Sequence, residues 1–159
     1  MSLQLDPPGE EEGEQNLFSN SRQFNQGIRE STDSKGTMNT TQVDAQNNVT
    51  ITSDSFVDLT NMSIAHESLT GTVLIIGNMT LDKNGATEEA INVIIDKDGT
   101  NQTKSERQVW IKGANEITTL TIMATFTNAS KNTWKLEWKG DDSAITKNCR
   151  NRSLMVMDI

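Results

Sequence analysis

The sequence predicts an all-β fold, an antiparallel β-sandwich of the jelly-roll type that follows an extended, irregular N-terminal arm. Apolar residues after about residue 49 recur with a period of two, the spacing that sends alternate side chains to opposite faces of a sheet. Turn residues interrupt these runs roughly every 8–12 residues, and no stretch has a convincing helical period. Proline is absent beyond the arm, so nothing confines these runs to sheet edges.

About seven to nine strands are expected, which is the number typical of a sandwich or jelly roll. Turn signals separate them, above all Asn84-Gly85 and Asp96-Lys97-Asp98-Gly99, because Asn, Asp and Gly readily take the backbone conformations of tight turns. In chain order, the expected strands are residues 49–51, the less regular stretch 56–59 with 62–64, then 71–81, 90–95, 107–112, 117–126, 134–138 and 154–159.

Two of these strands have an informative pattern. Residues 117–126 alternate most regularly, with Leu120, Ile122, Ala124 and Phe126 on one face. Trp134, Leu136 and Trp138 share a face, which favours packing in the core over a sugar-stacking platform that would also use Trp110.

Residues 1–48 form the predicted arm, and residues 49–159 form the predicted β domain. The arm has neither structural period, and its few apolar residues are isolated among Gln, Asn, Ser, Glu and Gly. Such a segment cannot bury enough apolar surface to fold alone. It is either a solvated tail or an arm that docks on a partner, with Leu17, Phe18 and Phe24 as its anchors.

The terminal strand 154–159 is apolar on both of its faces apart from Asp158. Leu154 and Val156 can face the core, which leaves Met155, Met157 and Ile159 for cover by another sheet of the same domain or by another subunit. We expect these three residues to form a subunit interface.

Composition excludes several classes of function. The net charge of −8 argues against a nucleic-acid partner, because phosphate binding needs clustered Lys and Arg. No apolar run approaches the ~20 residues of a membrane span. The N-terminus lacks the pattern of a signal peptide, so we expect synthesis in the cytoplasm. Seven Asn-X-Ser/Thr sequons are expected from the Asn-, Ser- and Thr-rich composition rather than from glycosylation.

Residues able to support catalysis are scarce. The chain has one histidine, His66, and one cysteine, Cys149. A closed zinc site needs more ligands than these two residues supply, and no nucleophile or phosphate-binding motif occurs. We expect His66 at the surface or at a strand end and Cys149 to be buried or idle, although the sequence leaves an interchain disulfide open. The sequence therefore predicts no catalytic residues, cofactor or metal.

Two stretches near the end of the chain carry a resemblance to a known family. They are Trp134-Lys135-Leu136-Glu137-Trp138-Lys139 and Arg152-Ser153-Leu154-Met155-Val156-Met157-Asp158-Ile159. They resemble the closing strands of TNF/C1q-like jelly-roll domains in virion proteins of tailed bacteriophages. The resemblance covers about residues 105–159 and rests on pattern, and the absence of tyrosine departs from it.

The resemblance implies a homotrimeric capsid decoration (cement) protein, with no cofactor and no catalytic residues. Its arm would bind the major capsid protein or other virion proteins. The alternative is a tail or head fibre or spike module that binds a host receptor or a surface carbohydrate. Such a module is expected to show aromatic residues in its loops, whereas these loops consist of Asn, Gly, Asp, Lys and Thr, which favours the decoration protein.

Overall fold

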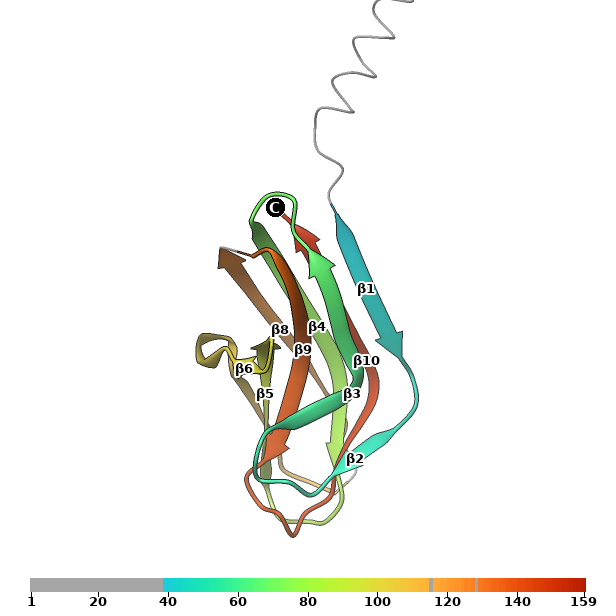
Figure 1. The fold of residues 1–159 in the computed structure, drawn as a ribbon. Coiled ribbons are helices and arrows are strands. Elements are labelled where there is room, and N and C mark those ends of the chain that lie inside the picture. Colours follow the sequence, from blue (N-terminus) through green and yellow to red (C-terminus); the bar gives the residue numbers. More distant parts are fainter. Residues whose placement is uncertain (1–38, 115, 128) are drawn as a thin grey trace, which may run out of the picture. The chain divides into compact units, whose positions relative to one another are not determined.

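The computed structural model describes residues 39–114, 116–127 and 129–159. These residues form two antiparallel sheets that pack face to face (Figure 1), which confirms the predicted antiparallel β-sandwich. The chain divides into two units, Met1–Thr37 and Met38–Ile159. The proposed arm anchors Leu17, Phe18 and Phe24 lie outside the described residues. Among the described residues, no helix is long and apolar enough to cross a membrane.

Sheet A has the strand order β1-β10-β4-β8, and β2 pairs with β10 beside β1. Its two central strands are the long β10 and β4, and β8 forms one edge of the sheet. The bounds are β1 (Thr40–Ala45), β2 (Val49–Ile51), β4 (Thr72–Lys83), β8 (Thr118–Thr127) and β10 (Lys147–Asp158).

Sheet B has the strand order β3-β9-β5-β6, and β7 also pairs with β5. A short 3-10 turn, η1 (Thr103–Ser105), joins β6 to β7. The bounds are β3 (Val57–Glu67), β5 (Glu89–Lys97), β6 (Thr100–Asn101), β7 (Arg107–Ile111) and β9 (Lys131–Gly140).

The core lies between the two sheets and is built from one face of each strand. Trp134, Leu136 and Trp138 on β9 are at most 1 % exposed, so the prediction that they pack in the core is confirmed. Sheet A contributes Ile122 from β8, together with buried residues of β4 and β10. Gly77 lies where an added Cβ would stand 2.8 Å from Ile122 and from Leu136, so the opposing side chain fills the space that a larger residue would need.

Two elements differ from the sequence prediction. β1 lies inside the range 1–48 that the sequence assigned to the arm. The sequence did not reveal this strand, because an alternation of Thr, Gln and Asp with a few apolar residues is typical both of a half-exposed edge strand and of a polar loop. β3 covers most of the expected less regular stretch, 56–59 with 62–64, and continues to Glu67. Its pairing with β9 shifts between Asp58 and Ser63, where Asn61 has a φ of 64°, so a bulge interrupts the expected period.

The predicted tight turn at Asp98-Gly99 is confirmed. β5 ends at Lys97 and β6 begins at Thr100, and both turn residues have positive φ angles of 52° and 83°. Two positive φ angles define the turn type that matches the twist of a two-residue hairpin. The Asp98 carboxylate accepts hydrogen bonds from the Thr133 amide and the Asn132 side chain, which lower its pKa.

Candidate interaction surface

The outer face of sheet A carries four partly exposed apolar side chains on its two central strands. They are Leu74 and Ile76 on β4 and Met155 and Met157 on β10. Along each strand they alternate with fully buried residues that face the core. Met157 lies opposite Leu74 and Met155 opposite Ile76 in the strand register. The four side chains therefore form one continuous area, which we call the sheet A patch.

Side chains of the two flanking strands form the rim of this patch. On β1, Thr40 lies opposite Met157 and Gln42 opposite Met155. On β8, Thr125 lies opposite Leu74, and Met123, 57 % exposed, lies opposite Ile76. An apolar centre with a largely polar rim is the usual composition of a protein interface.

The structure brings together two of the three predicted interface residues. Met155 and Met157 lie side by side in the sheet A patch, whereas Ile159 follows the end of β10 and is 52 % exposed. The sequence did not indicate Leu74 and Ile76, because their place depends on the pairing of β4 with β10. The described residues leave all four patch side chains partly exposed, so the patch is not covered within the domain as a core would be.

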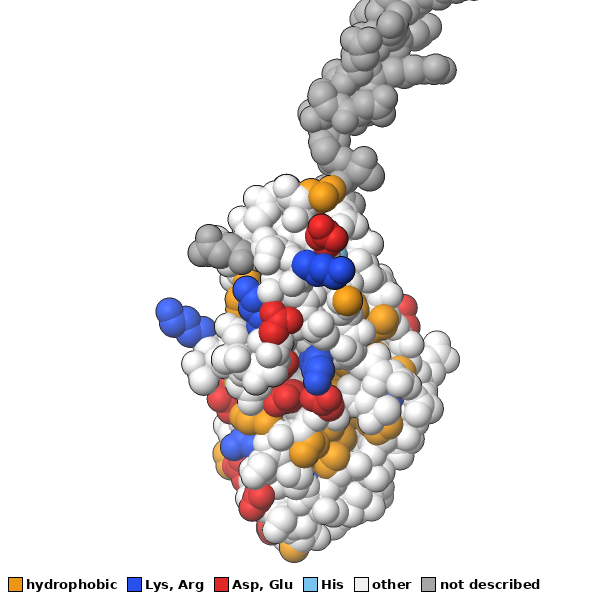
Figure 2. All heavy atoms as spheres, in the orientation of Figure 1, with side chains coloured by type: hydrophobic (Ala, Val, Ile, Leu, Met, Phe, Trp, Pro, Cys, Tyr) orange, Lys and Arg blue, Asp and Glu red, His pale blue; other side chains and the backbone are white. Residues whose placement is uncertain are grey.

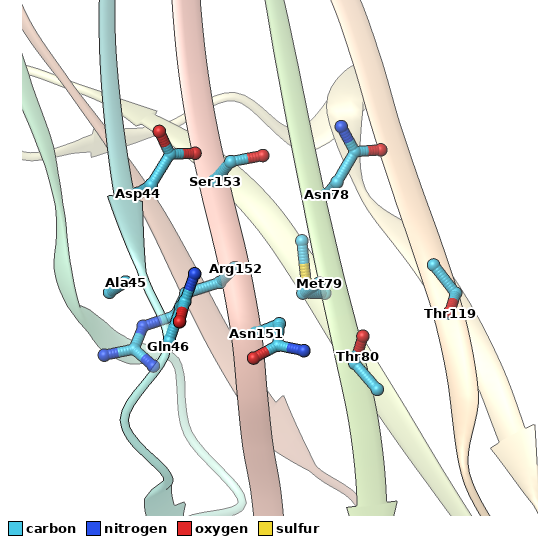
Figure 3. Close-up of a pocket in the computed structure, with 10 residues that line it drawn as sticks. All are labelled: Asp44, Ala45, Gln46, Asn78, Met79, Thr80, Thr119, Asn151, Arg152 and Ser153. Atoms are coloured by element: carbon cyan, nitrogen blue, oxygen red, sulfur yellow. The ribbon is translucent and has the colours of Figure 1, made fainter.

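Farther along the same face, the apolar patch gives way to a shallow polar groove of about 410 Å³ (Figure 3). Asp44, Ser153 and Asn78 line its upper part from three adjacent strands, and Thr119 lines it from β8. Asn78 accepts a hydrogen bond of 2.7 Å from the hydroxyl of Thr121. The outer face of sheet A thus has an apolar half and a polar half.

Arg152 lies under this groove and is 3 % exposed. Its guanidinium donates hydrogen bonds to the carbonyl oxygens of Thr60, Arg150 and Asn47 and to the side-chain oxygen of Asn47. These acceptors lie at the β3 bulge, on the irregular part of β10 and in the β1–β2 connection. Since its bonds hold three irregular segments together, Arg152 has a structural role at this site.

His66 is buried, at 2 % exposure, and lies one residue before the end of β3, so the expected strand-end position is confirmed and the surface position is wrong. Its Nε2 lies 3.1 Å from Oδ1 of Asp158 on β10, and its Nδ1 lies 3.1 Å from the hydroxyl of Thr41 on β1. The other oxygen of Asp158 accepts a hydrogen bond from the Leu69 amide. The imidazole alternates inward like its neighbours in β3, and the two partners satisfy its polarity, which explains the burial.

A hydroxyl, an imidazole and a carboxylate in this order have the composition of a nucleophilic triad, but the surroundings favour a structural role. Thr41, His66 and Asp158 line neither the polar groove nor a second cleft, which lies beside residues 123–126 of β8. A triad needs space for a substrate beside its nucleophile. The chain of contacts instead ties β1, β3 and β10 together.

On the face shown in Figure 2, acidic and basic side chains mix with smaller hydrophobic areas. Lys135 pairs with Asp58 at 2.9 Å. Burial raises the pKa of the neighbouring Glu137 carboxyl, and the nearby carboxylates of Asp96 and Asp58 raise it further. No group of His, Cys, Asp and Glu among the described residues has an arrangement that could hold a metal ion.

Cys149 is fully buried where β10 lies between β2 and β4. Burial raises the pKa of its thiol to about 12. A thiol in this environment is protonated and inaccessible near neutral pH, which confirms the expected buried cysteine and disfavours an interchain disulfide.

No family model matches the sequence, and no curated protein sequence matches it. Among solved structures, the fold is similar to a chain in the structure of infectious bursal disease virus Gx strain, with a TM-score of 0.53, 14 % identity and coverage of 77 % of this chain and 32 % of that chain. It is also similar to the infectious bursal disease virus VP2 subviral particle, with a TM-score of 0.52, 13 % identity and coverage of 77 % and 33 %. The chain spans about a third of the length of these virus proteins.

A further similar structure is the EclA C-terminal domain, a sugar-binding protein, with a TM-score of 0.40, 14 % identity and coverage of 73 % of this chain and 78 % of that chain. The two stronger similarities show a shared β-sandwich fold with proteins of virus particles, and at this identity they show the fold alone.

Proposed function

We propose that this chain is a non-enzymatic structural protein of a virus particle, namely a decoration (cement) protein on the head of a tailed bacteriophage. In this proposal it acts as a homotrimer, and its arm binds the major capsid protein or other virion proteins through Leu17, Phe18 and Phe24. It is made in the host cytoplasm and assembles into the virion. The observation that carries the proposal is the sheet A patch.

The patch supports self-association because of its place in the fold. Leu74, Ile76, Met155 and Met157 occupy the two central strands of the sheet, where an apolar outer face has no packing role within the domain. Each side chain is already half-buried, so complete burial contributes about 1 kcal/mol per residue, and several subunits together offset the entropy cost of association. Met side chains adapt well to such contacts.

The polar side chains with catalytic potential support a role without catalysis. His66 and Asp158 tie strands together, Arg152 binds backbone carbonyls, and Cys149 is buried as a protonated thiol. Each of these groups has a structural partner or environment that accounts for its place in the fold.

Substitution of Met157 by Asp tests the proposal. The carboxylate would stand on the outer face of sheet A, so the variant is expected to fold but to lose the trimer, because an unpaired charge in an apolar contact is strongly disfavoured. Sedimentation velocity at micromolar concentration measures the association, and circular dichroism measures the fold. The matched control is Thr119→Asp, which places the same charge on the same face beyond the patch and is expected to remain trimeric. A native protein that sediments as a monomer would contradict the proposal.

A further inference from the structure

β8 is a long edge strand whose outer side is open. It runs for ten residues, Thr118–Thr127, and pairs with β4 alone. A strand paired on one side leaves every second amide and carbonyl group without a partner in the sheet. No backbone hydrogen bond joins β8 to any other described strand or loop. This edge therefore offers a regular row of donors and acceptors.

The other edge strands have protective features that β8 lacks. β1 is short and carries Asp44, and β3 carries acidic residues and the bulge at Asn61. β7 has only five residues and begins with Arg107. Charges, bulges and short length are the devices by which natural sheets avoid pairing at their edges. β8, with the sequence TTLTIMATFT, has no charge, no proline, no glycine and no bulge in its pairing with β4.

The side of the sandwich next to β8 is also open. A cleft of about 610 Å³ separates residues 123–126 of β8 from the segment around η1, which contributes Thr103, Lys104 and Ser105 to the lining. Two large hydrophobic side chains lie in or directly before this strand, Ile117 at 59 % and Met123 at 57 % exposure. An added strand at this edge would find space and apolar contacts.

We propose that the edge of β8 pairs antiparallel with β8 of a second copy of this chain, about a two-fold axis at Met123, to form one continuous sheet. This contact goes beyond the trimer proposed above and uses the open edge of β8, whose Met123 and Thr125 also belong to the rim of the sheet A patch. The chain carries a net charge of −8, but β8 itself is uncharged. A second copy therefore fits at this edge, because two identical β8 strands can pair without placing like charges opposite each other.

The side-chain pattern specifies the register. Odd-numbered residues of β8 point outward and even-numbered residues point toward the core, so only registers that keep this parity match the two faces. With Met123 opposite its own copy, Thr121 lies opposite Thr125, and Leu120 lies opposite Phe126 on the inner side. This register buries the exposed Met123 and joins aliphatic to aromatic side chains, a favourable cross-strand pair.

A pair of double substitutions tests the contact. Thr121→Lys with Thr125→Lys would set two lysines opposite each other on both sides of the axis, whereas Thr121→Lys with Thr125→Glu would form two opposite-charge pairs at the same positions. The dimer dissociation constant, measured by sedimentation equilibrium in the Met157→Asp background, is expected to be at least about tenfold weaker for the first variant than for the second. Equal association of the two variants would overturn the proposal.

Cross-linking gives a second readout. Met123→Cys is expected to form a disulfide-linked dimer under mild oxidation, while the native chain gives none because its Cys149 is buried. A Met123→Cys protein that stays monomeric on non-reducing gels would contradict the two-fold axis. Because Met157→Asp removes the sheet A contact alone, failure of the trimer and failure of the β8 contact are distinguishable.

Discussion

His66, Thr41 and Asp158 connect strands that are far apart in the sequence. The His66 imidazole contacts β1 through a hydroxyl and β10 through a carboxylate, at 3.1 Å in each case. Burial raises the pKa of the Asp158 carboxyl, but the hydrogen bonds from the Leu69 amide and from His66 lower it by more, so its pKa lies below the ordinary value of 3.8. The ionised carboxylate therefore stabilises the folded state.

Replacement of Asp158 by Asn is expected to reduce the free energy of unfolding by about 2 kcal/mol near neutral pH, the usual contribution of hydrogen bonds to a charged group. The folded-state pKa is lower than the unfolded one, so this contribution is present above pH ~4 and is lost as the pH falls through the folded-state pKa. Urea denaturation of both proteins from pH 7 to pH 2 measures the difference, which should shrink at the acid end. The control is Asp54→Asn, at an exposed position. A constant difference across this range would contradict the role of the charge.

Gly77 limits side-chain volume in the centre of the core. An alanine there would place its Cβ 2.8 Å from Ile122 and from Leu136, so Gly77→Ala is expected to lower the free energy of unfolding by about 1–3 kcal/mol. Chemical denaturation measures this loss. Gly113→Ala is the matched control, because the nearest atom to its added Cβ is 3.8 Å away. Equal stability of the two variants would mean that the core has space at Gly77.

For individual residues, the sequence predicted some side-chain environments and not others, and the difference has a physical reason. Trp134, Leu136 and Trp138 were predicted in the core because alternation alone decides which face of a strand is buried. His66 was expected at a strand end, where it lies, but its burial was not predicted, because that burial depends on Asp158, 92 residues away. A single sequence contains no signal for such a distant polar partner.

Among the elements, β10 shows how buried charge conceals a strand. The sequence indicated only residues 154–159, but the strand begins at Lys147. Lys147 is fully buried and pairs with Glu89 at 3.1 Å, and Glu89 also accepts hydrogen bonds from the amides of Asp141 and Asp142. The polar residues at the start of β10 therefore look like a turn in the sequence, although Lys147, Asn148 and Arg150 each have a carboxylate partner in the fold.

β1 gives a prediction for truncation. Removal of residues 1–38 is expected to leave a folded β domain, whereas removal of residues 1–46 also deletes β1, which pairs with β10 from Thr40 to Ala45 and supplies the Thr41 contact to His66. The longer deletion should lower the melting temperature strongly or abolish folding. Thermal unfolding followed by circular dichroism compares the two proteins.

The shorter deletion also tests the proposed arm. If Leu17, Phe18 and Phe24 anchor the protein, the domain without residues 1–38 should fold and form trimers but fail to attach to heads. Equal occupancy of the full-length and shortened proteins on particles would contradict the arm contact. Equal stability of the two deletions would contradict the role assigned to β1.

At the level of the whole molecule, the antiparallel sandwich was predictable because period and turn signals act locally along the chain. The sheet A patch was predictable in part. Met155 and Met157 share an unexplained face within one strand, but Leu74 and Ile76 join them only through the β4–β10 register. Strand order is a non-local property, and local patterns do not determine it.

The two ends of the described domain lie side by side, because the Asp158 amide donates a 3.0 Å hydrogen bond to the carbonyl oxygen of Asn39. The exposed connection between β4 and β5, residues 84–88, lies at the far end of the long strand β4. A short linker could therefore join residue 159 to residue 39, and new termini could open in the β4–β5 connection. Such a circular permutant would keep every strand pair of both sheets and would present its termini at the opposite pole of the sandwich. The fold thus depends on which strands pair and on their register, whereas the order of the strands along the chain can change.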